Sequence, residues 1–374
     1  MLREFKVKNY KNFESELHID FTNVHDYQYN EYCVKNGLIN KIIVYGKNAE
    51  GKSNLGTALF DMIYDLQMRS PFLYRNDQKM YKNANSKEDD LVEFLYSFQL
   101  DGDILTYEYK KNNAFTMVCE KLSLNGQVVF YYDLQKNIRD FSNIEKINAQ
   151  DLNWANFFDS DNNEEEASRP TALRYIIYNT VQKEGSAIYK LGQFIKGMRF
   201  TSSLTASSRL HFPFEEYFED AGELKKFEDF LNTHGVRCKL VMLEQPDGKK
   251  ELYFDHSKPL HFASNLSSGT LALTRFYVQY LMRSKPTFVF MDEFDAFYHY
   301  ELSEKIVDLL EKEFDCQVIL TSHNTDLLSN SIMRPDCFMI LSNGKLTPIC
   351  EATTRELRQG HNLEKLYKNG EFNV

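Results

Sequence analysis

The sequence predicts an α/β protein with an antiparallel β subdomain and a helical insertion. Three patterns support this fold class. A compact apolar stretch at residues 41–45 leads into a glycine loop and then into helical spacing at residues 53–68. Residues 91–133 alternate apolar and polar side chains, as half-buried antiparallel strands do. From residue 236 onward, helix and strand patterns alternate again, which is typical of a parallel sheet.

The composition is that of a folded chain of 374 residues, long enough for two domains or one elaborated domain. Hydrophobic residues make up 43% and aromatic residues 14%, which argues against disorder. No apolar run reaches the roughly 18 residues of a membrane-spanning helix, and the N-terminus lacks the apolar stretch of a signal peptide. We therefore expect no membrane partner. The six cysteines form no C-x-x-C pair, so we expect reduced thiols in a cytoplasmic protein.

Residues 1–139 are predicted to form the N-terminal half of the core together with a β meander. Two short strands are expected at residues 2–8 and 15–21. Within the meander, the turn signals are Asp-Gly-Asp at 101–103 and the hairpin dipeptide Asn-Gly at 125–126. Both signals follow runs of alternating apolar residues, so the strands on either side should pair as antiparallel neighbours.

Residues 140–235 are predicted to form a mainly helical insertion. Helical spacing of apolar residues recurs at 172–182, 188–196 and 224–231. An acidic run at residues 159–166 precedes these helices. We interpret it as a solvated loop, because carboxylates on a flexible loop lack the fixed geometry of a metal site.

Residues 236–374 are predicted to form the C-terminal half of the core. A hairpin opens this part, helices and strands then alternate, and an Asn-Gly pair at 343–344 marks a last hairpin. The elements expected between these points are strands at 237–243 and 251–255, a helix at 270–283, a strand at 287–291, a helix at 300–313 and a strand at 316–321.

The sharpest motif is Gly-Lys-Asn-Ala-Glu-Gly-Lys-Ser at residues 46–53, which fits the phosphate-binding pattern G-x-x-x-x-G-K-[ST]. Its glycines let backbone N–H groups curl around phosphates, and the N-terminus of the following helix adds positive potential. We expect Lys52 to contact the β- and γ-phosphates of ATP, and the Ser53 hydroxyl to bind Mg²⁺. The predicted nucleotide-binding residues here are Gly46, Asn48, Gly51, Lys52, Ser53 and Asn54.

A second motif, Thr-Phe-Val-Phe-Met-Asp-Glu at residues 287–293, brings two carboxylates to the end of a buried strand. We expect Asp292 to hold the Mg²⁺ shell and Glu293 to orient or deprotonate the attacking water. The next strand is followed by His323, and since the carboxyl ends of such strands line a nucleotide crevice, this histidine is placed to sense the γ-phosphate. The predicted catalytic residues are therefore Lys52, Glu293 and His323.

A further segment, Asn-Leu-Ser-Ser-Gly-Thr at residues 265–270, precedes a helix and by itself is only a helix cap. In their order along the chain, these four segments and the opening turn at residues 9–13 resemble the ABC-type ATPase heads of the SMC and RecF kind. The resemblance spans nearly the whole chain. It implies a P-loop NTPase fold of the ABC/SMC-head type.

The resemblance also implies how two copies of the chain would cooperate. Ser267 and Gly269 would belong to the signature segment, which in such heads caps the ATP held by a second copy, so that two heads sandwich two nucleotides. Ser268 and Thr270 depart from the family form Leu-Ser-Gly-Gly-Gln. Asp295 would lie in the loop that couples the two sites. The candidates for the family's glutamine loop are Gln99 and Gln193.

The chain more closely resembles stand-alone bacterial ATPases of anti-phage defence and abortive-infection systems. The segments that carry this resemblance are Asp-Glu-Phe-Asp at 292–295 followed by His299, Thr-Ser-His-Asn-Thr at 321–325, Arg-Pro-Asp at 334–336, and the tail at 361–367. The resemblance implies that the chain acts with a separate effector protein, often a nuclease.

The sequence is compatible with three functions. An ATP-hydrolysing switch would close as a homodimer or higher homo-oligomer around ATP and would open on hydrolysis. An ATP-stabilised scaffold would hold a toxic effector with little turnover. A RecF-like DNA-binding ATPase would need a basic groove, although the net charge is −10. The basic residues available for such a groove are Lys190, Lys196, Arg199 and Arg209.

Overall fold

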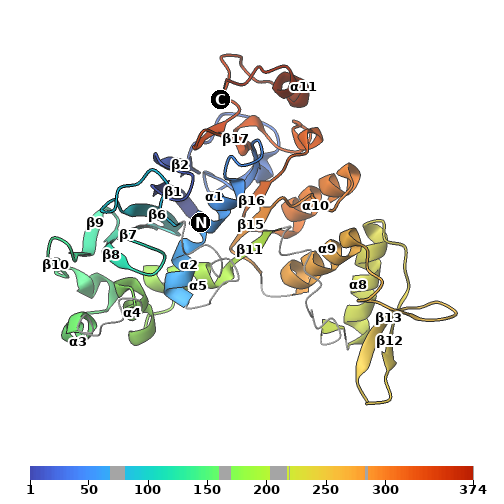
Figure 1. The fold of residues 1–374 in the computed structure, drawn as a ribbon, viewed down its shortest axis with the longest axis horizontal. Coiled ribbons are helices and arrows are strands. Elements are labelled where there is room, and N and C mark those ends of the chain that lie inside the picture. The colour runs from blue at the N-terminus through green and yellow to red at the C-terminus, as the bar shows by residue number, and fades with distance from the viewer. Residues whose placement is uncertain (68–80, 160–169, 203–216, 219, 283–284, 374) are drawn as a thin grey trace.

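The computed structural model describes residues 1–67, 81–159, 170–202, 217–218, 220–282 and 285–373. Its strands form a mostly parallel sheet and a large antiparallel sheet, together with two smaller sheets. In Figure 1 the antiparallel sheet lies at the left, the parallel strands lie in the middle, and helices α9 and α10 lie to their right. The predicted α/β class with an antiparallel subdomain is confirmed.

The parallel sheet has the strand order β11-β15-β16-β5-β17-β18, and β18 runs antiparallel to its neighbour β17. Its strands are β5 (Lys41–Tyr45), β11 (Met198–Ser202), β15 (Phe288–Asp292), β16 (Gln317–Thr321), β17 (Phe338–Ser342) and β18 (Lys345–Pro348). Every residue of β5, β15 and β16 is buried, as expected for central strands that are covered on both faces. Because these three strands are parallel, their carboxyl ends meet at one edge of the sheet.

The antiparallel sheet has the strand order β10-β9-β8-β7-β6-β1-β2. Its strands are β1 (Leu2–Lys8), β2 (Leu17–Asp20), β6 (Val92–Leu100), β7 (Asp103–Lys111), β8 (Met117–Leu124), β9 (Gln127–Asp133) and β10 (Ile138–Asp140). At the predicted hairpin between β8 and β9, Asn125 and Gly126 have φ values of 52° and 79°, as a type I′ turn requires. The predicted meander is therefore confirmed.

The remaining strands of the described residues form two small sheets. They consist of β3 (Val34–Lys35) and β4 (Leu38–Ile39), and of β12 (Leu240–Glu244), β13 (Lys250–Phe254) and β14 (Leu260–His261). The α-helices are α1 (Lys52–Leu59), α2 (Asp61–Gln67), α3 (Trp154–Asp159), α4 (Ala172–Asn179), α5 (Ala187–Gly197), α8 (Ala221–Thr233), α9 (Ser268–Phe276), α10 (Tyr300–Glu313) and α11 (Leu363–Lys368). None of the helices in the described ranges has both the length and the apolar character needed to cross a membrane.

Two predicted helices differ in detail from the structure. The helix expected at 53–68 is divided into α1 and α2 at Phe60. There the Tyr96 hydroxyl donates to the Ala58 carbonyl at 2.8 Å and competes for an acceptor that a continuous helix would use. The helix expected at 270–283 begins as α9 and continues as a π-helical segment, η5 (Tyr277–Met282).

In the described part of the region at 140–235, the structure contains the predicted helices and also strand β11, which was not predicted. Strand β11 joins the parallel sheet beside β15, although its sequence, Met-Arg-Phe-Thr-Ser, has no continuous apolar run. Such a sequence is tolerated because β11 is an edge strand and only its first and last residues are buried. The acidic run expected as a solvated loop falls largely on residues 160–169, which lie outside the described residues. The division of the chain at residues 140 and 236 stays a prediction.

The two large sheets are joined at Gln317, the first residue of β16. Its buried side-chain amide accepts the Leu2 N–H at 2.6 Å and donates to the Leu2 carbonyl at 2.8 Å. Leu2 begins β1, so the first strand of the antiparallel sheet is tied directly to the centre of the parallel sheet. Buried amides need such partners, and this pairing also fixes how β1 lies against β16.

A buried ionic cluster holds the short helix α2 against the antiparallel sheet. The Lys111 ammonium lies 3.1 Å from Asp61 and 2.9 Å from Asp65, and its side chain is fully buried. The hydroxyls of Tyr81 and Tyr109 each donate to Asp61 at 2.8 Å. Burial raises the pKa of the Asp65 carboxyl to about 7. The cluster therefore depends on the cation to keep two carboxylates in the core.

We predict that Lys111→Met lowers the free energy of unfolding by about 3–5 kcal/mol near neutral pH, since it leaves buried carboxylates without a counter-charge. Because the folded-state pKa of Asp65 is raised, the deficit should shrink at about pH 5, where protonation removes its charge. Urea unfolding at both pH values measures this difference.

The matched control is Lys110→Met, one residue earlier in β7. Lys110 pairs with Glu93 at 3.0 Å, and both side chains are 42% exposed. Loss of such a surface pair should cost less than about 1 kcal/mol. Equal losses for the two variants would contradict the role of the buried cluster.

Candidate functional site

Three of the predicted motifs meet at the carboxyl edge of the parallel sheet. The loop at 46–53 follows β5, Asp292 ends β15, and Thr321 ends β16. In open α/β sheets this edge is where nucleotides and other ligands bind. The motifs are far apart in the sequence, and parallel pairing of β15, β16 and β5 brings them together.

The loop at 46–53 is shaped by its two glycines. A Cβ atom on Gly46 would lie 2.7 Å from the backbone oxygen of Leu341, so a side chain there would collide with β17. Gly51 has a φ of 104°, which other residues rarely adopt, and it immediately precedes α1. The backbone can therefore close tightly at the N-terminus of α1, as a phosphate cradle requires.

Lys52 is buried at the base of this loop. Its ammonium donates to the Gly46 carbonyl at 2.8 Å and to the Lys47 carbonyl at 3.2 Å. Burial lowers the pKa of Lys52, although nearby carboxylates act in the opposite direction. An ammonium that is held among loop carbonyls beside a glycine cradle fits the chemistry of a bound triphosphate.

Asn12 is a part of this loop's support that the sequence analysis missed. Its side-chain amide donates to the Glu50 carbonyl at 2.8 Å, and its oxygen accepts from Asn54 at 2.7 Å. Asn54 was predicted to bind nucleotide, and the structure shows it bonded to Asn12. Asn48 is exposed on the loop. The signal for Asn12 was its place in the turn at 9–13, but only the fold shows which loop it reaches.

The expected magnesium ligands lie side by side. The Ser53 hydroxyl donates to Oδ2 of Asp292 at 2.7 Å. Asp292 is buried, and Oδ1 of the same carboxylate accepts from the Thr321 hydroxyl at 2.8 Å. A hydroxyl and a carboxylate are oxygen ligands of the kind that Mg²⁺ prefers, so the residues present fit this ion. Ser202, at the end of β11, also lies 3.4 Å from Oδ2 of Asp292 and was not predicted.

Glu293 and His323 follow the ends of neighbouring strands, as predicted. Glu293 is half-buried and has a left-handed backbone with a φ of 49°. His323 is exposed. Asp295 is connected to the same region, because the Ser322 hydroxyl donates to its carboxylate at 2.5 Å. Burial raises the pKa of Asp295, and this hydrogen bond opposes the shift.

The fourth motif lies on the other face of β15. Ser267 caps α9 by accepting the Thr270 N–H at 3.1 Å, and a Cβ on Gly269 would lie 3.0 Å from the Phe297 carbonyl. Side chains alternate along β15: Phe290 faces Gly56 of α1, whereas Met291 faces α9. Figure 1 likewise shows α1 and α9 on opposite sides of the parallel strands. The structure thus does not bring Ser267 and Gly269 to the loop of their own chain.

The glutamine-loop candidates remain unassigned. Gln99 lies in β6 of the antiparallel sheet, and its backbone pairs with Met1. Gln193 is exposed on α5. Within the described ranges, no hydrogen bond joins either side chain to the loop at 46–53.

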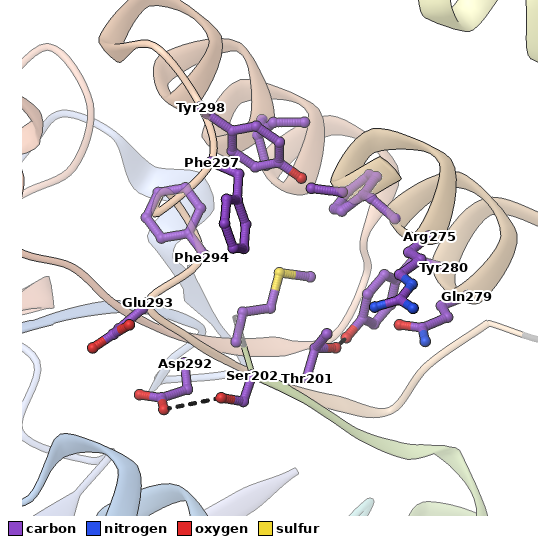
Figure 2. A pocket seen from close by; sticks show the side chains of 14 residues that line it. Thr201, Ser202, Arg275, Gln279, Tyr280, Asp292, Glu293, Phe294, Phe297 and Tyr298 are labelled. Atoms are coloured by element: carbon purple, nitrogen blue, oxygen red, sulfur yellow. Dashed lines mark hydrogen bonds between the residues drawn. The ribbon is translucent and has the colours of Figure 1, made fainter. Parts of the chain in front are cut away.

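A small cavity lies beside Glu293. The helical segments α9 and η5 line one side of it, and the loop at 293–298 lines the other. Figure 2 shows its labelled lining residues, Thr201, Ser202, Arg275, Gln279, Tyr280, Asp292, Glu293, Phe294, Phe297 and Tyr298. Its volume of about 50 Å³ admits a few water molecules and excludes a nucleotide. In Figure 2 the carboxylates of Asp292 and Glu293 point away from this cavity. The candidate nucleotide site is therefore on the other side of these two residues.

We predict that Asn12→Ala weakens MgATP binding by about tenfold, because two hydrogen bonds that hold the loop, each worth about 0.5–1.5 kcal/mol, are lost. Titration calorimetry with a slowly hydrolysed ATP analogue measures the dissociation constant.

The control is Glu14→Ala, the residue just after this turn, whose exposed side chain accepts a hydrogen bond from Asn85 at 3.0 Å and does not contact the loop at 46–53 in the described residues. This variant should bind nucleotide as the wild type does. Unchanged affinity in Asn12→Ala would show that the turn does not support the loop.

Comparison with known proteins identifies the family of this chain. The SMC head domain from Thermotoga maritima is 14% identical with a TM-score of 0.43, over 93% of this chain and 98% of that chain. An Smc head domain with an extended coiled coil, derived from Pyrococcus furiosus and bound to the C-terminal domain of ScpA, is 13% identical with a TM-score of 0.46, over 92% and 95%. No curated protein matches the sequence.

The sequence profile of one family matches residues 41–329, which is well over half of the chain. This family is described as "AAA domain, putative AbiEii toxin, Type IV TA system". The matched range begins at β5 and includes the loop at 46–53, Asp292, Glu293 and His323. The chain belongs to this AAA domain family.

Proposed function

We propose that the chain is an ATP-hydrolysing switch that dimerises around ATP and controls a separate effector protein in bacterial anti-phage defence. The observation that carries this proposal is the 2.7 Å contact between Ser53 at the start of α1 and Asp292 at the end of β15, with Glu293 next in the chain. A phosphate loop, a magnesium carboxylate and a candidate base are thereby combined in one place.

ATP binding would use groups that already face the loop. The triphosphate would bind at the N-terminus of α1 and would contact the ammonium of Lys52. In the structure this ammonium donates to the carbonyls of Gly46 and Lys47. Mg²⁺ at Ser53 and Asp292, when bound, would neutralise charge on the β- and γ-phosphates. Burial disfavours the charged form of Lys52, so a bound phosphate anion would also relieve that cost.

Hydrolysis would rest on Glu293 and His323. Glu293 would orient the attacking water and accept its proton. His323, two residues after the end of β16, would contact the γ-phosphate and report whether it is present. Loss of that contact after hydrolysis gives a physical difference between the ATP and ADP states, which a switch requires.

The position of α9 supports the proposed dimer. Because the sheet separates Ser267 and Gly269 from the loop of their own chain, these residues would reach ATP only in a second copy. Asp295 lies between the two regions, bonded to Ser322 beside His323. By the resemblance to SMC and RecF heads, the loop that carries Asp295 would couple the nucleotide sites of the two copies.

The effector and the biological setting are supported by the family description, which names a toxin and a type IV toxin–antitoxin system. The net charge of −10 favours a protein partner over a nonspecific nucleic-acid partner. For the effector we propose a nuclease or another toxic enzyme encoded separately. A scaffold that holds this effector with little turnover is the second candidate, and the oligomer measurement below separates the two.

A DNA-binding ATPase finds less support in the structure. Lys190 pairs with Asp101 at 2.7 Å, and the Arg199 guanidinium donates to the backbone carbonyls of Lys196 and Met198. Arg209 lies outside the described residues. Duplex binding that weakens steeply with salt would favour this function over the other two.

We predict that Glu293→Gln lowers the hydrolysis rate by about 100-fold or more, as expected for the loss of a general base. ATP should still bind, so this variant should accumulate as an ATP-bound dimer, whereas the wild type should dimerise only transiently. Phosphate release and mass measurement with and without MgATP test both points.

Glu304→Gln, an exposed position in α10, is the control and should behave as the wild type. Unchanged hydrolysis in Glu293→Gln would show that the catalytic assignment is wrong. If hydrolysis is lost but the mass never responds to nucleotide, the dimeric switch is wrong and the scaffold becomes the better explanation.

A further inference from the structure

The hydroxyl of Thr321 lies between the two acidic residues of the site. It donates to Oδ1 of Asp292 at 2.8 Å and accepts the backbone N–H of Glu293 at 2.7 Å. Thr321 is the last residue of β16, and its side chain is fully buried. One hydroxyl on the neighbouring strand thus contacts both Asp292, the last residue of β15, and Glu293, the residue after it.

The turn after β15 depends on Thr321 for its backbone as well. The N–H of Glu293 bonds to the Thr321 hydroxyl, and the N–H of Phe294 bonds to the Thr321 carbonyl at 3.2 Å. Glu293 has a φ of 49°, a conformation that costs a non-glycine residue energy and persists only where its surroundings impose it. These two hydrogen bonds are such surroundings, because they hold successive N–H groups of the turn.

The two oxygens of Asp292 have different hydroxyl partners. Oδ1 accepts from Thr321 of β16, and Oδ2 accepts from Ser53 of α1. If Mg²⁺ takes up Ser53, the bond from Thr321 to Oδ1 can remain and keep the plane of the carboxylate unchanged. A valine has the same shape as threonine but offers neither the donor nor the acceptor.

We infer that Thr321 is a positioning residue for hydrolysis, which orients the Asp292 carboxylate toward Mg²⁺ and holds Glu293 in its left-handed conformation facing the γ-phosphate. This inference rests on the proposed ATPase function. It also joins the catalytic turn to the segment that carries His323, because Thr321 precedes that histidine by two residues on the same chain segment.

The test compares Thr321→Val with Thr321→Ser in the full chain. Thr321→Val should lower kcat at least tenfold and leave the KM for ATP within about threefold. It should also raise the Mg²⁺ concentration needed both for half-maximal rate and for binding of a slowly hydrolysed ATP analogue, which titration calorimetry measures without turnover. Thr321→Ser retains the hydroxyl and should keep kcat within about threefold of the wild type. A merely structural role would not separate kcat from KM or shift the Mg²⁺ requirement.

Thr106→Val is the matched control, since it removes a hydroxyl from β7 of the antiparallel sheet, where Thr106 contacts Ser97 at 3.4 Å. It should leave kcat and the Mg²⁺ requirement unchanged. If Thr321→Val fails to fold, Thr321→Ala replaces it, with the same expected changes in kcat and Mg²⁺ requirement.

Three outcomes would overturn the inference. One is wild-type kcat and Mg²⁺ dependence in Thr321→Val. Another is a folded Thr321→Ser variant that is as impaired as Thr321→Val, because the hydroxyl would then not be the group that matters. The third is a wild type without hydrolysis, which would overturn the proposed function too. Wild type and Glu293→Gln are therefore measured in parallel. If wild type hydrolyses ATP and Glu293→Gln does not, the proposed function holds, and an unaltered Thr321→Val then contradicts only the inference about Thr321.

Discussion

The arrangement of the site depends on keeping the carboxylate of Asp292 in a buried position. Only 2% of this residue is exposed, and a buried carboxylate needs hydrogen-bond donors. Hydroxyls of Ser53, Ser202 and Thr321 lie within hydrogen-bond distance of its two oxygens. They come from α1, β11 and β16. The Asp292 carboxylate therefore connects the helix that follows the loop at 46–53, an edge strand and the strand that precedes His323. A shift of any of these elements would leave part of the carboxylate without a partner.

The antiparallel sheet contributes to the same region through a few polar contacts. Asn12, in the turn after β1, supports the loop at 46–53, and Gln317 ties the start of β1 to β16. Lys111 on β7 binds Asp61, the first residue after α1 and its break at Phe60. The segment from the loop at 46–53 to the start of α2 is thus held at one end by the turn after β1 and at the other end by β7 of the antiparallel sheet.

Much of the fold and the outline of the site could be predicted because their signals are local. The loop at 46–53 and the apolar strand before Asp292 are short patterns whose physical requirements are met within a few residues. Asn12, Ser202 and Thr321 could not be found this way, since each acts on a partner that only the folded sheets bring near. Strand β11 was missed for a related reason: as an edge strand it is stabilised by pairing with β15 and needs no apolar run of its own.

The left-handed backbone of Glu293 has a consequence for how this chain can vary. Glycine adopts such a conformation without steric cost, and asparagine tolerates it better than glutamate. At this position the residues most compatible with the backbone therefore lack the carboxylate that the proposed chemistry needs. Substitutions at this position that only stabilise the turn would therefore remove the proposed catalytic carboxylate and leave the loop at 46–53 unchanged. A relative with glycine or asparagine here would be more stable and, on the proposed mechanism, would bind nucleotide without hydrolysing it.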